Sequence, residues 1–284
     1  FAVALATNAY YYREHMIRDL VSHLTYTHMF FYDAYYASNL GGALWTLAIE
    51  MQFYLLFPLI ARAFYKLPTT TFAAMVAIAL GFRGWVSVNV KDVALYFNQL
   101  PAYLDTFALG MMAANIHAWL SRKKHGAISR VLCSGLSVCM LCMIWQVVRR
   151  QASNPSVEMI RLGQMSNRLA MGLLGAGFLV FSANAGLVLR RILGNPLTKF
   201  FSGISLQFYI WHQTIAVWLI TYKVIPSAYE NPNWEGDPVW QMQYTIACFA
   251  LSVLAAAGIT YGFERPIAKK LQAMWNARRA KGEV

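Results

Sequence analysis

Four ionisable residues lie within otherwise apolar stretches and are the first candidates for chemistry: Glu50, Arg83, Asp105 and His212. A carboxylate or an imidazole can accept or orient a proton, and a guanidinium can counter a developing negative charge. Charged side chains in apolar segments are costly, so they generally mark a functional site or an ion pair that joins helices. The ion pair could join Arg83 to Glu50 or to Asp105, and position alone favours catalysis and structural pairing about equally.

The composition indicates where these residues reside. Of the 284 residues, 58% are hydrophobic and 13% are charged, against about 25% charged residues in soluble domains. Lys and Arg number 24 and Asp and Glu 12, which gives a formal net charge of +12. Such an excess is typical of proteins that bind nucleic acid or anionic membranes, but a nucleic-acid-binding domain needs a polar surface. We therefore expect an all-α, polytopic membrane helix bundle with no nucleic-acid partner.

Seven segments are long and apolar enough to cross a bilayer, which takes about 20 residues. They are 42–64, 69–90, 100–120, 128–148, 169–189, 197–222 and 241–263. Residues 16–31 are apolar but carry several ionisable side chains, which favours a helix lying in the membrane interface. Residues 1–9 indicate the end of a further, partial helix. We expect one membrane domain over 1–270 that is truncated at its N-terminus, followed by a basic tail over 271–284.

The distribution of charge predicts an orientation. Fifteen of the 24 basic residues but only two of the 12 acidic residues fall on one side of the predicted bundle, and the other side has eight of each. Cytoplasmic loops are enriched in Lys and Arg. We therefore expect a multi-pass protein of the cytoplasmic membrane with its C-terminus in the cytoplasm.

In this orientation the four ionisable residues share a depth. Glu50 and Asp105 lie about 12 and 8 Å below the outer ends of their helices, at about 1.5 Å per residue. Arg83 and His212 lie about 21 and 22 Å above the inner ends of theirs, in a core about 30 Å thick. The sequence thus predicts a polar cavity that is reached from outside.

Several other polar residues have simpler interpretations. His212 itself is expected to be a packed histidine bonded to a backbone carbonyl, in preference to a catalytic group. Arg168 is expected to extend from its helix to the membrane interface. His15, His23 and His28 lack the spacing of metal ligands, and we expect them to be solvated at the surface.

Two short patterns in the apolar segments are interpreted as packing. Cys139 and Cys142 have CxxC spacing but no second ligand pair, so we expect neither a metal site nor a redox loop. Gly172, Gly175 and Gly177 resemble part of a dinucleotide turn, but they follow no strand and lie in an apolar segment. Small residues of this kind allow helices to approach closely.

The most specific motif occupies residues 44–58, Leu-Trp-Thr-Leu-Ala-Ile-Glu-Met-Gln-Phe-Tyr-Leu-Leu-Phe-Pro. It resembles the W-[ST]-L-x-x-E-x-Q-F-Y-L-L-x-P signature of the acyltransferase 3 family. Residues 103–110 are similar to the family's R-x-D-x-F-x-x-G segment, with tyrosine in place of the arginine. Residues 205–212 are similar to its S-x-x-x-Y-x-x-H helix, and residues 264–266 to its E-x-P.

Members of this family are integral membrane enzymes that transfer acyl groups to hydroxyls of surface glycans and related molecules. The resemblance implies acyl-CoA as co-substrate, most simply acetyl-CoA, no bound cofactor or metal, and a hydroxylated acceptor such as a polysaccharide of the cell envelope. The family has roughly ten helices, so this chain would begin within the third. Its candidate catalytic histidine, on the first helix, would then lie outside these residues.

Helix geometry divides the main motif into two faces. Thr46, Glu50 and Tyr54 are four residues apart and share one face, whereas Trp45 and Gln52 are seven apart and share another. We predict that the first face points to the cavity and the second to a neighbouring helix. All five are candidates for binding or orienting the substrates.

The resemblance also suggests roles for the ionisable residues. Glu50 would orient the base or the acceptor, and Arg83 would counter the charge of an oxyanion or a phosphate. Asp105 would hold Arg83, and His212 would supply a supporting hydrogen bond. Two other functions are compatible with a polar group of residues in a membrane: a transporter or translocator, and a scaffold subunit for a separate enzyme.

Overall fold

The computed structural model describes most of the chain. The described residues are 9–36, 41–90, 93–123, 126–153, 156–227, 229, 232 and 236–280. Within them the regular secondary structure is helical and contains no strand, which confirms the all-α prediction. The predicted partial helix over residues 1–9 lies outside the described residues except for Ala9, which opens a longer helix.

The chain divides into two compact units, each considered by itself. The first contains residues 1–9, 39–44 and 195–284, and the second contains residues 10–38 and 45–194. The described helices that lie mainly in the second unit are α2 (Ala9–Leu24), η1 (His28–Phe30), α3 (Tyr32–Tyr36), α4 (Gly41–Lys66), α5 (Pro68–Asn89), α6 (Val93–Phe97), η2 (Leu100–Tyr103), α7 (Leu104–Ser121), α8 (Ala127–Ala152), α9 (Val157–Ser166), α10 (Arg168–Ala183) and α11 (Leu187–Leu193). Those of the first are α12 (Pro196–Thr221), α14 (Pro238–Ile259), the π-helical turn η3 (Thr260–Glu264) and α15 (Arg265–Ala280).

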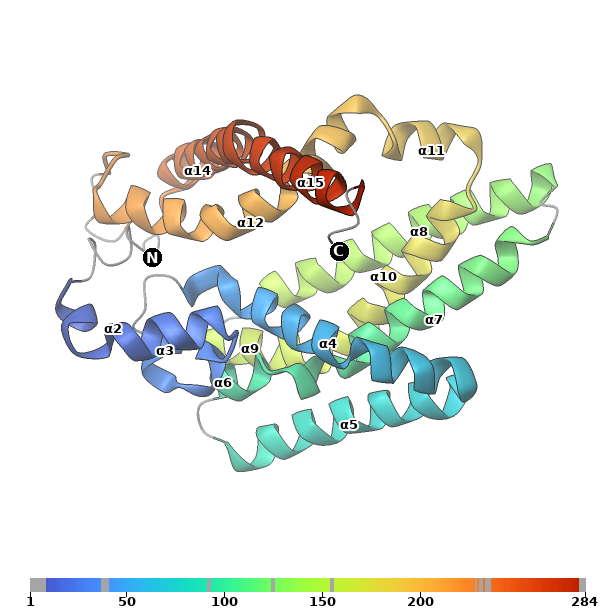
Figure 1. Ribbon diagram of the computed structural model, residues 1–284. Helices are drawn as coiled ribbons and strands as arrows, with labels where there is room; N and C mark the ends of the chain where they lie inside the picture. Colours follow the sequence, from blue (N-terminus) through green and yellow to red (C-terminus); the bar gives the residue numbers. More distant parts are fainter. Residues whose placement is uncertain are drawn as a thin grey trace. The chain divides into compact units, whose positions relative to one another are not determined.

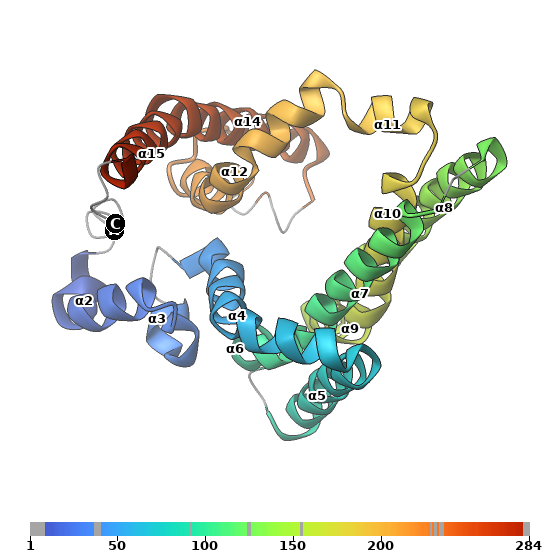
Figure 2. The same cartoon turned by 45° about the vertical axis from the view of Figure 1, so that its right-hand side comes forward.

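In the first unit, α12 and α14 pack side by side, as both ribbon views show (Figures 1 and 2). Each begins at a proline, whose missing N–H costs nothing at a helix start. Asn195 and Asp237 precede these prolines and cap the helices, because their side-chain oxygens accept hydrogen bonds from backbone N–H groups of the first turn. The Tyr244 hydroxyl joins the two helices by donating to the Ala216 carbonyl oxygen at 3.0 Å.

In the second unit, an apolar cluster joins α4 to its neighbours. Its buried members come from η1, α4, α5, η2 and α7, and are Met29, Ala48, Ile49, Phe53, Met75, Leu100 and Ala108. The rings of Phe53 and Phe107 stack with their centroids 3.8 Å apart. Between helices in a membrane, such contacts stabilise the structure through van der Waals packing. The cluster therefore fixes the rotation of α4, which carries the main sequence motif.

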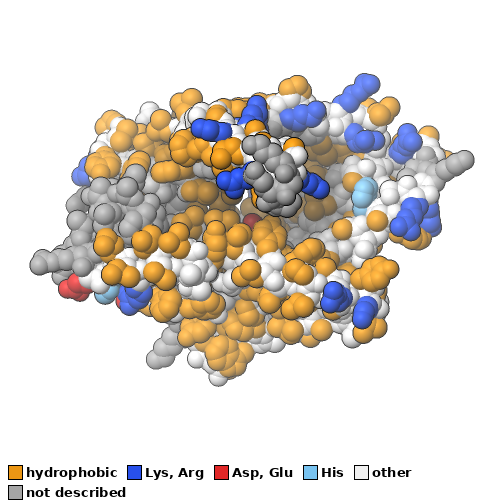
Figure 3. Space-filling view, in the orientation of Figure 1, with side chains coloured by type: hydrophobic (Ala, Val, Ile, Leu, Met, Phe, Trp, Pro, Cys, Tyr) orange, Lys and Arg blue, Asp and Glu red, His pale blue; other side chains and the backbone are white. Residues whose placement is uncertain are grey.

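The outer surfaces of the helices are strongly apolar. Leu55 on α4 and Leu254 on α14 are 81% and 68% exposed, although a soluble protein would bury most such side chains. In Figure 3, hydrophobic side chains cover much of the visible face of each unit, and Lys and Arg gather at the turn between α7 and α8. Helices that satisfy their own backbone groups can present such surfaces to lipid.

Four helices among the described residues are long and apolar enough to cross a membrane: Ala43–Lys66, Pro68–Asn89, Ala127–Ala152 and Pro238–Ala280. Helices α10 and α11 would together make a fifth, but they meet at a bend of 117°. The prediction of one continuous span over 169–189 was therefore wrong. The predicted total of seven spans remains a prediction.

The break between α10 and α11 has a local cause. The Asn184 side chain donates to the Val180 carbonyl at 2.8 Å and so competes with the regular helical pattern. Two residues later, the Gly186 N–H donates to Ser134 Oγ on α8 at 2.9 Å. These contacts end one helix and start the next within an apolar run.

The predicted interfacial helix over residues 16–31 is also interrupted. Helix α2 ends at Leu24, and Tyr26 then adopts a left-handed backbone conformation with φ of 57°. The chain turns back at this point and continues as η1. Asp19 and His28 are buried, so the segment packs against the protein on part of its surface.

The glycines of α10 provide a test of the helix packing. A Cβ at Gly172 would lie 2.9 Å from Leu109 Cδ1 on α7, whereas a Cβ at Gly175 meets nothing within 4 Å among the described residues. We expect Gly172→Leu to lower the free energy of unfolding by about 1–3 kcal/mol through overpacking. Gly175→Leu is the matched control, since both changes alter helix propensity equally. Thermal unfolding of the purified protein in detergent measures the difference, and equal midpoints for the two variants would contradict the packing.

Candidate functional site

The face of α4 that was predicted to contact neighbours does so. The indole ring of Trp45 lies 5.9 Å from the ring of Tyr103, between centroids. Gln52 Nε2 donates to the Tyr26 carbonyl oxygen at 2.8 Å. That carbonyl belongs to the left-handed residue of the turn between α2 and η1, so Gln52 holds the turn against α4. Trp45 thus contacts the neighbouring helix η2, as predicted, whereas Gln52 contacts a turn. Binding of a substrate by either residue remains a prediction.

The opposite face of α4 carries the remaining motif residues. Glu50 is exposed, Tyr54 is 59% exposed and Thr46 is partly buried. Ile49, next to Glu50, is 3% exposed and points into the apolar cluster. The carboxylate of Glu50 therefore projects from a helix whose rotation is fixed from the other side. That this face lines a substrate cavity remains a prediction.

A buried ion pair links α5 to the start of α7. Arg83 Nη2 donates to Asp105 Oδ2 at 2.6 Å, and Arg83 Nη1 donates to the Ala102 carbonyl oxygen at 2.8 Å. The two side chains are 6% and 0% exposed. The sequence left open whether Glu50 or Asp105 pairs with Arg83, and the structure pairs Asp105.

The local sequence explains how the partners of Arg83 are presented. Pro101 lies in the short helix η2, which ends just before α7 and turns the Ala102 carbonyl toward α5. Asp105 lies in the first turn of α7, where a negative charge is favoured by the helix dipole. Its Oδ1 accepts a hydrogen bond from the Thr106 N–H at 2.8 Å. The carboxylate is thus held from both sides.

Arg168 belongs to the same site, and the expectation that it extends to the membrane interface was wrong. Its guanidinium carbon lies 3.8 Å from the ring centroid of Phe97 and 3.7 Å from that of Tyr103. Its Nη1 donates to the carbonyl oxygens of Phe97 at 3.2 Å and Ala102 at 3.5 Å. Cation–π contacts and carbonyl acceptors hold the charge inside the protein.

His212 lies in the first unit, on α12, whereas Glu50, Arg83 and Asp105 belong to the second. Its Nδ1 lies 2.6 Å from the Tyr209 carbonyl oxygen, and its ring stacks on Phe208. This confirms the packed histidine that the sequence favoured. A shared site with the other three residues remains a prediction.

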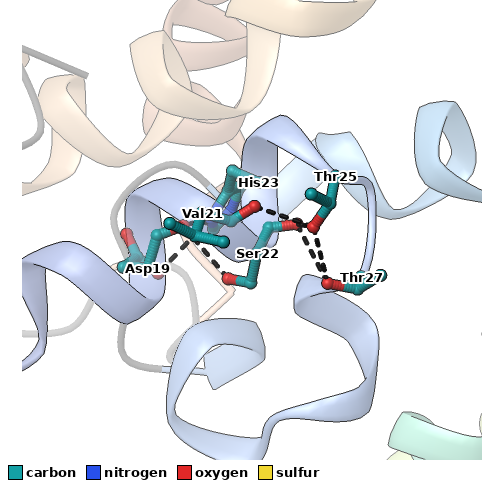
Figure 4. Close-up of polar contacts among 6 residues, drawn as sticks. All are labelled: Asp19, Val21, Ser22, His23, Thr25 and Thr27. Carbon is teal, nitrogen blue, oxygen red and sulfur yellow. Dashed lines mark hydrogen bonds and ion pairs between the residues drawn. The ribbon is translucent and has the colours of Figure 1, made fainter.

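The expectation of surface histidines was wrong for His23 and His28. Figure 4 shows the polar contacts at the end of α2, which run from Asp19 and His23 to Thr27. His23 Nδ1 lies 2.9 Å from the Asp19 carbonyl oxygen and 3.4 Å from its carboxylate Oδ1. The ring of His28 is parallel to that of His23, with centroids 4.2 Å apart, and His28 is 1% exposed. The reversal at Tyr26 causes this burial, and the sequence gives little sign of it.

Burial affects protonation at this turn. Nε2 of His23 and both ring nitrogens of His28 are buried without a hydrogen-bond partner among the described residues. Desolvation, together with the nearby His23, lowers the pKa of His28 to about 4. His28 is therefore neutral at physiological pH. Across the described part of the chain, no three His, Cys, Asp or Glu side chains converge as a metal site would require.

The helices and the buried ion pair indicate the class of protein, and a sequence comparison identifies the family. Long apolar helices with exposed hydrophobic faces and a buried ion pair are typical of helical membrane proteins. The chain matches the acyltransferase domain of the acyltransferase 3 family over residues 18–257, and it belongs to that family. Comparisons with curated proteins and with solved structures give no match.

The ion pair can be tested by removing one partner or both. Asp105→Ala leaves Arg83 buried without its carboxylate, and we expect it to lower the free energy of unfolding by about 3–5 kcal/mol. The double variant Arg83→Met/Asp105→Leu removes both charges and should recover most of that loss. Thermal unfolding midpoints measure both effects. A double variant as unstable as Asp105→Ala would show that the pair does not act as a unit.

The buried histidine predicts a pH dependence. The pKa of His28 is about 4 in the folded protein, against 6.5 for an unperturbed histidine, so the unfolded chain binds its proton first as the pH falls. Stability is complete above pH 6.5 and declines toward pH 4, by roughly 2 kcal/mol between pH 7.5 and 4.5. We expect His28→Gln to reduce the shift in the thermal midpoint between these two pH values. His15→Gln, on α2, is the control, and a shift in His28→Gln as large as that of the wild type would contradict this assignment.

Proposed function

We propose that this protein moves an acyl group, most simply acetyl, from acyl-CoA to a hydroxyl of a glycan or a related acceptor of the cell envelope. The observation that carries the proposal is the exposed Glu50 on an anchored α4, within the family motif. Membership of the acyltransferase 3 family supports acyl transfer as the reaction type. The donor and acceptor are inferred from the resemblance of the motifs.

The chemistry requires three tasks. A base removes the hydroxyl proton, the alkoxide attacks the thioester carbonyl, and the tetrahedral oxyanion collapses to release the thiol of CoA. In our proposal, Glu50 orients the base or the acceptor hydroxyl. Arg83 counters the negative charge, and Asp105 fixes Arg83 through the 2.6 Å contact.

The remaining candidate residues have supporting roles in the proposal. Thr46 and Tyr54 share the face of Glu50 and would contact the acceptor. Trp45 and Gln52 act by holding α4 in place, through Tyr103 and the Tyr26 carbonyl. His212 would stabilise α12 through the Tyr209 carbonyl.

The test measures acyl transfer by the complete protein that carries this chain. The protein is placed in liposomes with radiolabelled acetyl-CoA and a glycan acceptor. We expect Glu50→Gln to lower kcat/KM by about 100-fold, because misplacement of a reacting group by about 1 Å can cost that much. Glu14→Gln is the matched control, since Glu14 is also exposed but lies outside the motif. Wild-type activity in Glu50→Gln would overturn the assignment of Glu50.

The same assay separates the enzyme from a transporter. Label that becomes attached to the glycan supports acyl transfer. Label that crosses the membrane without forming an ester supports transport.

A further inference from the structure

The site around Ala102 contains more positive charge than its carboxylate neutralises. Arg83 and Arg168 both donate to the Ala102 carbonyl oxygen, at 2.8 and 3.5 Å. Asp105 accepts a hydrogen bond from Arg83, and Arg168 forms no ion pair with a carboxylate in the described part of the chain. Two guanidinium groups therefore meet at one backbone oxygen, and one carboxylate pairs with the first of them, which leaves a net charge of +1.

The second guanidinium is positioned without being neutralised. The acceptors of Arg168 Nη1 are two backbone carbonyls, which carry only partial charge. The rings of Phe97 and Tyr103 fix the plane of its guanidinium. Bringing like charges together in a weakly polar setting is unfavourable, and a bound anion relieves it.

The geometry suits an oxyanion. A guanidinium presents its N–H donors in a planar fork that matches the oxygens of a carboxylate or phosphate. Arg83 is held by Asp105 and by the Ala102 carbonyl oxygen, which fixes the direction of its guanidinium. Arg168 is only partly buried, so part of its side chain is exposed.

We propose that Arg83 and Arg168 form a binding site for a carboxylate or phosphate group of a substrate. This proposal rests on the proposed acyl transfer and deepens it, because it assigns Arg83 and Arg168 to the charged group of a substrate. Two sources offer the same chemistry: the phosphates of acyl-CoA, and an acidic acceptor such as a uronic acid or a phosphorylated sugar. Arg168 is then a specificity-determining residue.

The experiment compares charged and uncharged substrates with the complete protein. The donors are acetyl-CoA and S-acetyl-N-acetylcysteamine, a thioester that has no phosphate. The acceptors are a uronic-acid oligosaccharide, a phosphorylated oligosaccharide, and the neutral counterpart of each, made by carboxyl reduction or dephosphorylation. The variants are Arg168→Gln and Arg168→Lys, with Arg149→Gln at the exposed end of α8 as the matched control.

We expect Arg168→Gln to raise KM for the charged substrate about 10- to 100-fold, the usual loss for a charged hydrogen bond. Its KM for the uncharged counterpart and its kcat should stay within about twofold of wild type. Arg168→Lys keeps the positive charge but loses the planar set of guanidinium donors, so it should keep part of the preference for charged over uncharged substrates. If Arg168→Gln loses the preference for acetyl-CoA over the phosphate-free donor, the site binds the CoA phosphates. If it loses the preference for charged over neutral acceptors, the site binds the acidic glycan.

Two results overturn the proposal. One is a loss in Arg168→Gln that is equal for charged and uncharged substrates, which indicates a purely structural role. The other is unchanged kinetics with all substrates.

If the wild type acylates none of the acceptors, the proposed function fails, and the anion site is then judged by binding. Millimolar inorganic phosphate should raise the thermal midpoint of the wild type and of Arg149→Gln but not of Arg168→Gln. Absence of a rise in the wild type would overturn the site as well.

Discussion

The buried pair of Arg83 and Asp105 is the constraint on which the site depends. Two charges that leave water lose several kcal/mol of hydration each, and only close, fully bonded geometry recovers it. This requirement fixes α5 against η2 and the first turn of α7. The Ala102 carbonyl is drawn into the same geometry, and Arg168 then joins at that oxygen. The pair thus positions a second cation as well as its own partner.

Some residues of the motif on α4 hold the helix against its neighbours, and others are exposed. Trp45 and Gln52 are large enough to reach neighbouring segments, and the apolar cluster holds the helix between them. Rotation of α4 by one residue would move Ile49 out of that cluster. The direction of Glu50 is therefore set by packing on the other face of the helix. In the proposed function, a helix held in this way presents Glu50 to the substrate from a constant position, which favours binding and catalysis.

Local features predicted most helices but not the longer-range contacts. Apolar runs and helix-starting prolines gave the bounds of α4, α5, α8 and α12 within a few residues. The bend after Asn184 was missed, because a side chain that bonds its own backbone looks like any polar residue in an apolar run. Arg168 was missed because its partners are carbonyls and rings 65 to 71 residues away. The partner of Arg83 had to be a carboxylate at a similar depth, so the sequence narrowed the choice of partner to Glu50 and Asp105.

Tyr103 stands where the resembled family segment has an arginine, and its ring contacts the positive charge of Arg168. The related segment has an arginine at this position in the family, whereas here an aromatic ring supports the guanidinium of Arg168 at 3.7 Å. The ring of Tyr103 and the carbonyl oxygen of Ala102 thus receive a cation from α10. Since α10 also packs on α7 through Gly172, the position of the second cation is tied to helix packing as well as to sequence.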